Sequence, residues 1–295
     1  MHRDPESNEP PRSMPAIGVC SWSLRPGHPR DLLESLEGTG LSAVQLALLP
    51  LVDEPRIWAD SIQILRDHGI RILSGMFSTV HEDYTTLETI KATGGVRPDA
   101  HWPEILESAI RVADLAEECR IRLISFHAGF IPHDADDPCR ETVLHRLRQL
   151  IDMFGERGVS IAFETGQETA RTILDVLDEL DRPGVGINFD PANMILYGMG
   201  DPIEGIRLLA ERTVQVHVKD AVPSEVPGEW GAEVPVGTGA VDWPAFFDVV
   251  ASMPREVDLV IEREAGEARV ADIITARRVI EERFNATGDD TRETA

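Results

Sequence analysis

The sequence predicts an α/β protein with a single (β/α)8 barrel and an active site at the carboxyl ends of the barrel strands. Eight short apolar runs of strand type alternate with amphipathic helical patterns along the 295 residues, and this alternation is typical of such a barrel. A doubly wound open sheet would carry a glycine-rich nucleotide loop after its first strand. The chain reads Cys-Ser-Trp-Ser at residues 20–23 instead, so the closed barrel is favoured.

The predicted elements follow one another in strand–helix order. The strands are expected at residues 16–21, 41–47, 70–76, 121–127, 159–164, 185–190, 213–218 and 257–262, and the last helix at 270–284. Gly69, Gly158 and Gly184 stand just before three of these strands, where the end of the preceding helix favours glycine. Asp201 and Asp242 are each followed closely by proline, which predicts the N-caps of two further helices.

Polar segments flank the predicted barrel domain, which spans residues 15–285. Residues 1–14 and 286–295 have no apolar periodicity, which predicts a disordered tail at each end. The first segment has no apolar centre and therefore lacks the pattern of a signal peptide. No run approaches the ~18 apolar residues of a membrane-spanning helix.

Charge and cysteine content restrict the partners and the compartment that we expect. The 52 acidic residues outnumber the 28 Lys and Arg residues, which gives a formal net charge of −24. So acidic a surface repels nucleic acids and anionic lipids. Cys20, Cys119 and Cys139 are an odd number without CxxC spacing, which argues against disulfides or a zinc–thiolate site. We therefore expect a cytoplasmic protein without a nucleic-acid or membrane partner.

Four successive predicted strands end in an ionisable residue. These residues, named here the strand-end quartet, are Glu164, Asp190, His217 and Glu262. The carboxyl ends of barrel strands meet on one face, so the four side chains are expected to converge. Three carboxylates and one imidazole suit one divalent metal ion, with Mn²⁺ or Mg²⁺ preferred and Co²⁺ or Zn²⁺ also accommodated. Helix capping or a rim position would explain one such residue, but four in successive units favour a metal site.

The motifs around the quartet carry a family resemblance. The chain reads FETGQE at 163–168, NFDPAN at 188–193, HVKD at 217–220, GTGAVDW at 237–243 and IERE at 261–264. Over residues 16–284 this set resembles the xylose isomerase-like TIM-barrel superfamily of sugar phosphate isomerases and epimerases, which includes ketose 3-epimerases and inosose dehydratase-like members. The resemblance implies that the quartet binds one divalent metal ion. It also implies that Glu164 and Glu262 are the catalytic acid and base.

The implied activity is that of a metal-dependent isomerase or epimerase of a sugar or sugar phosphate. A metal chelated by a substrate carbonyl and its neighbouring hydroxyl stabilises an enediolate, while one glutamate removes a carbon-bound proton and the other returns one. The same chemistry can expel a β-hydroxyl, so a dehydratase or lyase acting on a keto-sugar or inosose is the alternative, and HVKD favours it. The expected partner is a small carbohydrate, and a homodimer or homotetramer is common among such barrels.

Two functions of other classes have less support. An AP-endonuclease-like phosphodiesterase needs additional metal-binding histidines, but the third strand ends in Ser-Gly-Met, residue 193 is asparagine and the stretch 231–236 has no Asp-x-His. A non-catalytic binding protein on a barrel scaffold is the other alternative. The complete ligand set with two glutamates argues against it.

Further side chains near the strand ends are candidates for substrate binding. They are His127, Asn193, Lys219, Trp22 and Trp230, with Phe77 as a further member of an apolar wall against a sugar ring. Lys219 is expected on the same face as His217, and an ion pair with Asp220 or Glu264 is its alternative role. Asn193 stands where the epimerases of this superfamily carry histidine.

Two local motifs have structural interpretations. Thr165 and Glu168 fit the S/T-x-x-E pattern of a capping box, which predicts that Glu168 stabilises the start of a helix. Gly-Thr-Gly at 237–239 is a turn before a helix, and its backbone N–H groups are a weak candidate for phosphate binding because no arginine cluster accompanies it.

Overall fold

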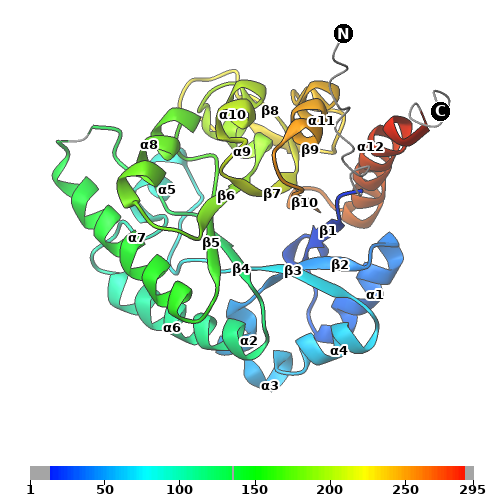
Figure 1. Cartoon of the computed structure of the whole chain (residues 1–295), viewed down its shortest axis with the longest axis horizontal. Coiled ribbons are helices and arrows are strands. Elements are labelled where there is room, and N and C mark those ends of the chain that lie inside the picture. The colour runs from blue at the N-terminus through cyan, green and yellow to red at the C-terminus, as the bar shows by residue number, and fades with distance from the viewer. Residues whose placement is uncertain (1–13, 135, 290–295) are drawn as a thin grey trace, which may run out of the picture.

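Eight parallel strands close into a barrel in a computed structural model that describes residues 14–134 and 136–289 (Figure 1). The order around the barrel is β1-β10-β7-β6-β5-β4-β3-β2. The strands are β1 (Ile17–Cys20), β2 (Ala43–Ala47), β3 (Arg71–Met76), β4 (Leu123–Phe126), β5 (Ser160–Glu164), β6 (Val185–Phe189), β7 (Thr213–Val218) and β10 (Asp258–Ile261). Each corresponds to one predicted run, so the predicted (β/α)8 barrel is confirmed.

Helices surround the strands (Figure 1). They are the 3-10 helix η1 (Ser21–Leu24) and the α-helices α1 (Pro29–Thr39), α2 (Leu49–Asp53), α3 (Pro55–Trp58), α4 (Ser61–Asp67), α5 (Leu87–Thr93), α6 (Trp102–Glu118), α7 (Pro138–Glu156), α8 (Ala170–Leu180), α9 (Pro191–Tyr197), α10 (Pro202–Leu209), α11 (Trp243–Ser252) and α12 (Arg269–Asp289). Helix α12 continues past the predicted end of the barrel domain at residue 285. The rest of both predicted tails, 1–13 and 290–295, lies outside the described residues. Within the described part of the chain, no helix has the length and apolar character needed to span a membrane.

Local signals in the sequence set several of these boundaries. Gly69, Gly158 and Gly184 have φ angles of +73°, +67° and +80°, and they reverse the chain before β3, β5 and β6. The side chain of Asp201 accepts two hydrogen bonds from the first turn of α10. The side chain of Asp242 accepts one from the first turn of α11. Both predicted N-caps are therefore confirmed.

The predicted capping box at Thr165 and Glu168 is wrong. Helix α8 begins later, and Thr169 is its N-cap. The hydroxyl of Thr165 instead accepts a hydrogen bond from the Asp190 backbone N–H at 2.8 Å. The Glu168 carboxylate accepts one from the Ile131 backbone N–H at 2.8 Å, and burial raises its pKa to about 8. Hydrogen bonds to neighbouring loops thus replace the local capping that the sequence pattern predicts.

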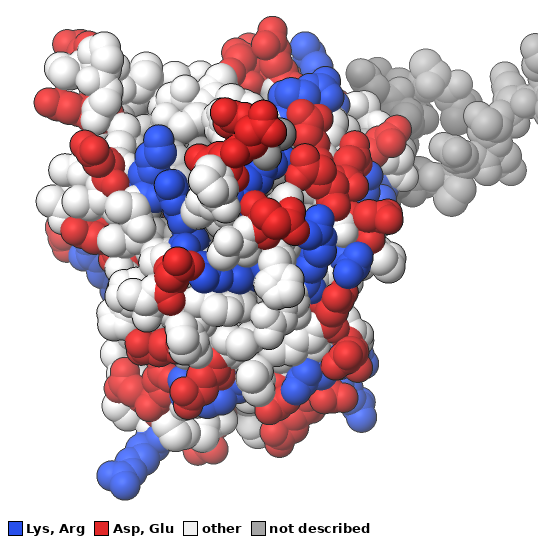
Figure 2. All heavy atoms as spheres, turned by 90° about the vertical axis from the view of Figure 1, so that its left-hand side faces the viewer, with Lys and Arg blue, Asp and Glu red and all other residues white. Residues whose placement is uncertain are grey.

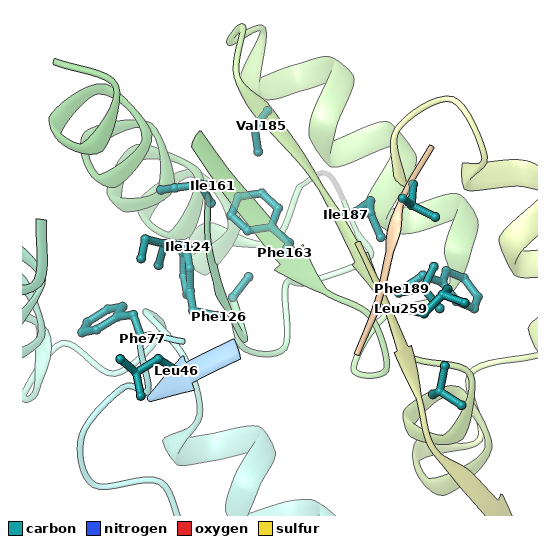
Figure 3. Close-up of a cluster of buried hydrophobic side chains, with 14 of the residues drawn as sticks. Leu46, Phe77, Ile124, Phe126, Ile161, Phe163, Val185, Ile187, Phe189 and Leu259 are labelled. Carbon is teal, nitrogen blue, oxygen red and sulfur yellow. The ribbon is translucent and has the colours of Figure 1, made fainter. Parts of the chain in front are cut away.

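The apolar core lies between the strands and the surrounding helices (Figure 3). Phe126 and Phe163 on neighbouring strands meet edge to face, with ring centroids 5.5 Å apart. Phe77 is fully buried and contacts Phe126, so its predicted place in a substrate-facing wall is wrong. Because strand side chains alternate, Gln45 and Ser125 point into the barrel and hydrogen-bond there at 2.7 Å. The inside of the barrel is therefore partly polar.

The two longest βα loops contain secondary structure of their own. The loop after β3 holds α5, and the loop after β7 holds an antiparallel hairpin of β8 (Asp220–Val222) and β9 (Ala232–Val234). Ile90, Phe130 and Tyr197 bury one another, and Trp230 packs against them with its ring centroid 4.9 Å from that of Tyr197. This satellite cluster connects the loops above the carboxyl ends of the strands.

The acidic excess is spread over the surface. Figure 2 shows acidic and basic side chains interspersed on one face of the molecule. Pairs between a turn and a helix account for part of this pattern, such as Arg182 with Asp152 and Arg212 with Asp178, each at 2.7 Å. Exposed pairs of this kind contribute little to stability.

Asp242→Ala tests the N-cap of α11. Removing the carboxylate leaves the Ala245 backbone N–H without its acceptor, and we expect the free energy of unfolding to fall by about 1 kcal/mol in urea denaturation. Asp175→Ala in α8 is the control, because Asp175 is exposed and lies 3.9 Å from its only charged partner within the described residues, Arg171. The control should change stability by less than about 0.5 kcal/mol. Equal losses for the two variants would contradict the capping role.

Candidate metal centre

The strand-end quartet converges at the carboxyl ends of β5, β6, β7 and β10. Glu164 ends β5, Asp190 and Glu262 directly follow β6 and β10, and His217 is the penultimate residue of β7. One ligand atom from each residue lies within 4.8 Å of the others. All four side chains are buried. The barrel thus assembles four residues that are far apart in sequence, as the strand-end pattern predicts.

The Nδ1 atom of His217 lies at the centre of the quartet. It is 3.5 Å from Glu164 Oε1, 3.6 Å from Asp190 Oδ2 and 3.2 Å from Glu262 Oε2. Both Nδ1 and Asp190 Oδ2 are buried and have no hydrogen-bond partner among the described residues. Buried polar atoms normally have a partner. One nitrogen and three carboxylates directed at the same point fit a single divalent cation.

The Nε2 atom of His217 faces two amides. Gln45 Oε1 lies 2.7 Å from it and Asn188 Nδ2 lies 2.9 Å from it. Gln45 Oε1 can only accept and therefore favours a proton on Nε2, whereas Asn188 Nδ2 can only donate and favours a lone pair there; the shorter contact, to Gln45, is the one that leaves the lone pair on Nδ1 for a metal ion. The sequence prediction did not include Gln45 or Asn188. Each could have been noticed in the sequence as a polar residue inside an apolar strand, Gln45 in β2 and Asn188 in β6.

Glu164 is surrounded by nitrogen atoms. Asn193 Nδ2 donates to its Oε1 at 2.9 Å, and His127 Nε2 lies 3.4 Å from the same oxygen. Burial alone would raise the pKa of Glu164, but His127 and His217 outweigh it and lower the pKa. Asn193 and His127, predicted as substrate contacts, therefore already contact a quartet member. The Asn193 backbone N–H also donates to Asp190 Oδ1 at 2.9 Å and fixes that carboxylate at the start of α9.

Glu262 is held by two donors on its other side. The indole Nε1 of Trp22 donates to Oε1 at 2.7 Å, and Lys219 Nζ donates to Oε2 at 3.0 Å. Burial would raise the pKa of Glu262, but Lys219 and His217 hold it well below its usual value. Lys219 also bonds Glu264 at 2.9 Å. The ion pair anticipated for Lys219 therefore forms with Glu264, whereas Asp220 is bonded elsewhere.

The two remaining quartet members respond differently to burial. Burial raises the pKa of Asp190 to about 6, although Lys219 opposes this shift. Burial would lower the pKa of His217, but nearby Cys20, Glu164 and Glu262 raise it well above its usual value. The quartet without a metal ion therefore retains a proton on the imidazole at neutral pH. A metal ion must replace that proton.

A cavity of about 740 Å³ opens beside Glu262. All five residues predicted to bind substrate line it: Trp22, His127, Asn193, Lys219 and Trp230. Trp230 Nε1 and His127 Nδ1 are buried and have no hydrogen-bond partner among the described residues, so both are available to a ligand. Glu82, Tyr84 and Tyr197 also line the cavity. Glu82 and Tyr84 lie in the loop after β3 and Tyr197 ends α9, and no sequence motif marks any of the three.

Residues 33–283 match the family model described as xylose isomerase-like TIM barrel. The chain belongs to this family. The resemblance seen in the sequence motifs is thereby confirmed at the family level.

Individual relatives differ in their activities. A xylose isomerase domain protein from Planctomyces limnophilus has a TM-score of 0.78 and 26% identity, and the match covers 91% of this chain and 97% of that one. A 3-oxo-isoapionate decarboxylase of Pectobacterium atrosepticum is 29% identical over 129 residues, which are 42% of this chain and 46% of that protein. Less than half of the decarboxylase is therefore covered. A D-tagatose 3-epimerase-like protein has a TM-score of 0.72 and 13% identity, with 94% of this chain and 99% of that one covered.

Other solved structures share the fold at lower identity. They include an L-ribulose 3-epimerase, a "probable 3-DHS dehydratase" from Bacillus anthracis and a xylose isomerase-like TIM barrel protein from Mycobacterium smegmatis in complex with magnesium, at TM-scores of 0.68 to 0.69 and identities of 13 to 17%. Part of the chain also matches an RNA polymerase β′ subunit of Ectopseudomonas mendocina at 28% identity, but this match covers 9% of that subunit. The solved structures show the fold alone, and the partial polymerase match carries no argument.

Metal binding should release a proton and strengthen as the pH rises. The raised pKa of His217 means that the imidazole of the metal-free protein is protonated at pH 7, and a metal ion needs it neutral. We expect the affinity for Mn²⁺ to increase with pH until the pKa of His217 is passed. Calorimetry at pH 7 in buffers of different ionisation enthalpy should show close to one proton released per Mn²⁺ bound. Proton uptake, or an affinity that falls as pH rises from 6 to 8, would contradict this assignment.

Gln45→Leu tests the support of His217. Loss of the amide oxygen removes the acceptor that orients the imidazole, and we expect Mn²⁺ affinity to fall by about 10- to 100-fold in calorimetric titrations. Gln215→Leu is a matched control, because Gln215 is buried on the same strand as His217 and its amide has no hydrogen-bond partner among the described residues. If both variants lost affinity equally, the effect would be one of barrel packing.

Proposed function

We propose that this chain is a divalent-metal-dependent isomerase or epimerase of a small carbohydrate, in which the strand-end quartet binds the metal ion. The observation that carries the proposal is the pair of buried glutamates at Nδ1 of His217. Both have a lowered pKa despite their burial. A metal site needs only ligands, whereas two carboxylates on opposite sides of a reacting carbon can also act as a base, when ionised, and as an acid, once protonated.

The bound ion would polarise a substrate carbonyl and stabilise the negative charge that develops when a neighbouring carbon is deprotonated. Glu262 lines the cavity and is kept ionised by Lys219, so it is placed to take a proton from the substrate. Glu164 lies against His127 and Asn193, which hold its carboxylate in position from the other side. Delivery of a proton that Glu164 has taken up from solvent, to the opposite face of the same carbon, would give epimerisation, whereas return of the abstracted proton by Glu262 to the neighbouring carbon would give isomerisation.

Other cavity residues orient a sugar in this proposal. Trp22 presents its ring to the cavity while its N–H fixes Glu262. The unpartnered N–H of Trp230 and Nδ1 of His127 are suited to sugar hydroxyl groups. Small carbohydrates are thus the proposed partners. Cytoplasmic location and assembly into a homodimer or homotetramer stay predictions from the sequence.

A lyase acting through the same enolate is the second candidate. The partial similarity to a 3-oxo-isoapionate decarboxylase favours it, because decarboxylation also leaves an enolate that a metal ion stabilises. A dehydratase is the related option, in which a β-hydroxyl leaves instead. Mass spectrometry of the product separates the three reactions: isomerisation conserves mass, dehydration loses water and decarboxylation loses carbon dioxide.

Glu164→Gln and Glu262→Gln test the acid–base roles. Each amide retains the shape of the side chain but cannot accept the proton, so we expect kcat to fall by at least about 100-fold for each variant. Activity is measured at saturating Mn²⁺, with bound Mn²⁺ determined in parallel to separate lost chemistry from lost metal. Glu88→Gln, at an exposed position in α5, is the control. Full activity in either quartet variant would refute the proposal.

A further inference from the structure

The side-chain carboxylate of Asp220, just after β7, binds a group of backbone N–H donors in the loop that follows. Both oxygens of Asp220 accept hydrogen bonds, and the donors are the backbone N–H groups of Ala221, Gly237, Gly239 and Val241 and the indole N–H of Trp243, at 2.9 to 3.2 Å. In many barrels the loops after the seventh and eighth strands and a helix N-terminus bind a substrate phosphate. In this protein the backbone N–H groups just before α11 already donate to the carboxylate of Asp220. The weak phosphate site predicted at Gly-Thr-Gly is therefore wrong.

The position of Asp220 is fixed by the backbone around it. A Cβ atom at Gly239 would lie 2.1 Å from Asp220 Oδ1, so only glycine lets the loop approach the carboxylate this closely. Asp220 is 1% exposed. Displacing it would leave a buried charge without hydrogen bonds, which is strongly unfavourable. An external phosphate therefore cannot take its place at low cost.

The cavity itself offers no free cation. Among the described residues that line it, four are carboxylates, Glu82, Glu233, Glu262 and Glu264, and Lys219 is the sole lysine or arginine. Lys219 is 4% exposed and bonds to two of those carboxylates. Its charge is thus already neutralised.

Arg263, which follows the cavity residue Glu262 in the chain, already has carboxylate partners. Arg263 donates to Glu233 at 2.7 Å and to Asp272 at 2.9 Å, and it does not line the cavity. The three quartet carboxylates exceed the charge of a divalent ion by one, and Glu82 has no cationic partner within the described residues. The cavity therefore stays net negative after the ion binds. An anionic group beyond the metal would meet carboxylates instead of the arginine fork or lysine that usually recognises it.

We propose that the substrate is an uncharged carbohydrate, without a phosphate or carboxylate group. This inference rests on the proposed function of the quartet and narrows its substrate class. Hydroxyl groups suit a cavity with carboxylate acceptors and the unpartnered N–H of Trp230. Repulsion from the rim carboxylates selects against charged analogues of the same sugar. A sugar acid of the kind named by the decarboxylase relative is disfavoured for the same reason.

Solvent-isotope exchange tests this selectivity on the Mn²⁺-loaded protein. Free ketopentoses and ketohexoses, and the terminal phosphate esters of the same sugars, are incubated in ²H₂O, and NMR follows the loss of the carbon-bound hydrogen next to the carbonyl. We expect exchange of at least one free ketose, with a kcat/KM at least about tenfold above that of its ester. Exchange of the esters as fast as or faster than the free sugars would overturn the inference but support the proposed function. Absence of exchange from both sets would refute the proposed function, and the inference with it.

Glu264→Gln tests whether the carboxylates around Lys219 cause the preference for a free ketose over its phosphate ester. The substitution leaves Lys219 with a single carboxylate partner, so the preference for the free ketose over its ester should narrow severalfold. Glu267→Gln is the matched control, because Glu267 has a 91% exposed side chain, pairs with Arg25 and does not line the cavity. The control should leave the preference unchanged. An equal effect of both variants, or none from Glu264→Gln, would show that these charges do not set the preference.

Discussion

The buried carboxylates of Glu164, Asp190 and Glu262 lie around Nδ1 of His217. Their three negative charges exceed the single positive charge that a protonated His217 can supply. Like charges ~4 Å apart repel by about 4 kcal/mol at an intermediate dielectric constant, so the quartet needs a positive charge at its centre. His217 supplies part of that charge when protonated. A divalent ion would supply more, with His217 Nδ1 and Asp190 Oδ2 as ligand atoms that otherwise lack a partner. The surrounding structure can be understood as support for this arrangement.

The two glutamates of the quartet, Glu164 and Glu262, have different hydrogen-bond and ion-pair partners. Glu262 faces Lys219 and the Trp22 indole, at the wall of the cavity. Glu164 faces His127 and Asn193. One carboxylate thus lies beside an ammonium group and an indole, and the other beside an imidazole and an amide. The two glutamates therefore differ in their neighbours, although both have a lowered pKa.

The sequence predicted the barrel and the quartet because both depend on local patterns. Alternating runs define strands, and a polar residue at the end of an apolar strand is visible without knowing its neighbours. Gln45, Asn188 and Asp220 escaped prediction because their roles depend on contacts across the barrel or with a distant loop. Asp220, for example, is bonded to residues as far away as Trp243. Glu168 was misassigned for the same reason, since a bond to Ile131 replaced the local cap that its spacing suggested.

Anomalous diffraction at the manganese edge, from crystals soaked in MnCl₂, would show whether the quartet binds a metal ion. We expect one strong peak inside the quartet, about 2.1 Å from His217 Nδ1 and in contact with carboxylate oxygens of Glu164, Asp190 and Glu262. Nε2 should stay hydrogen-bonded to Gln45. A quartet without a peak at saturating Mn²⁺, or a metal ion bound on the Nε2 side, would contradict this expectation.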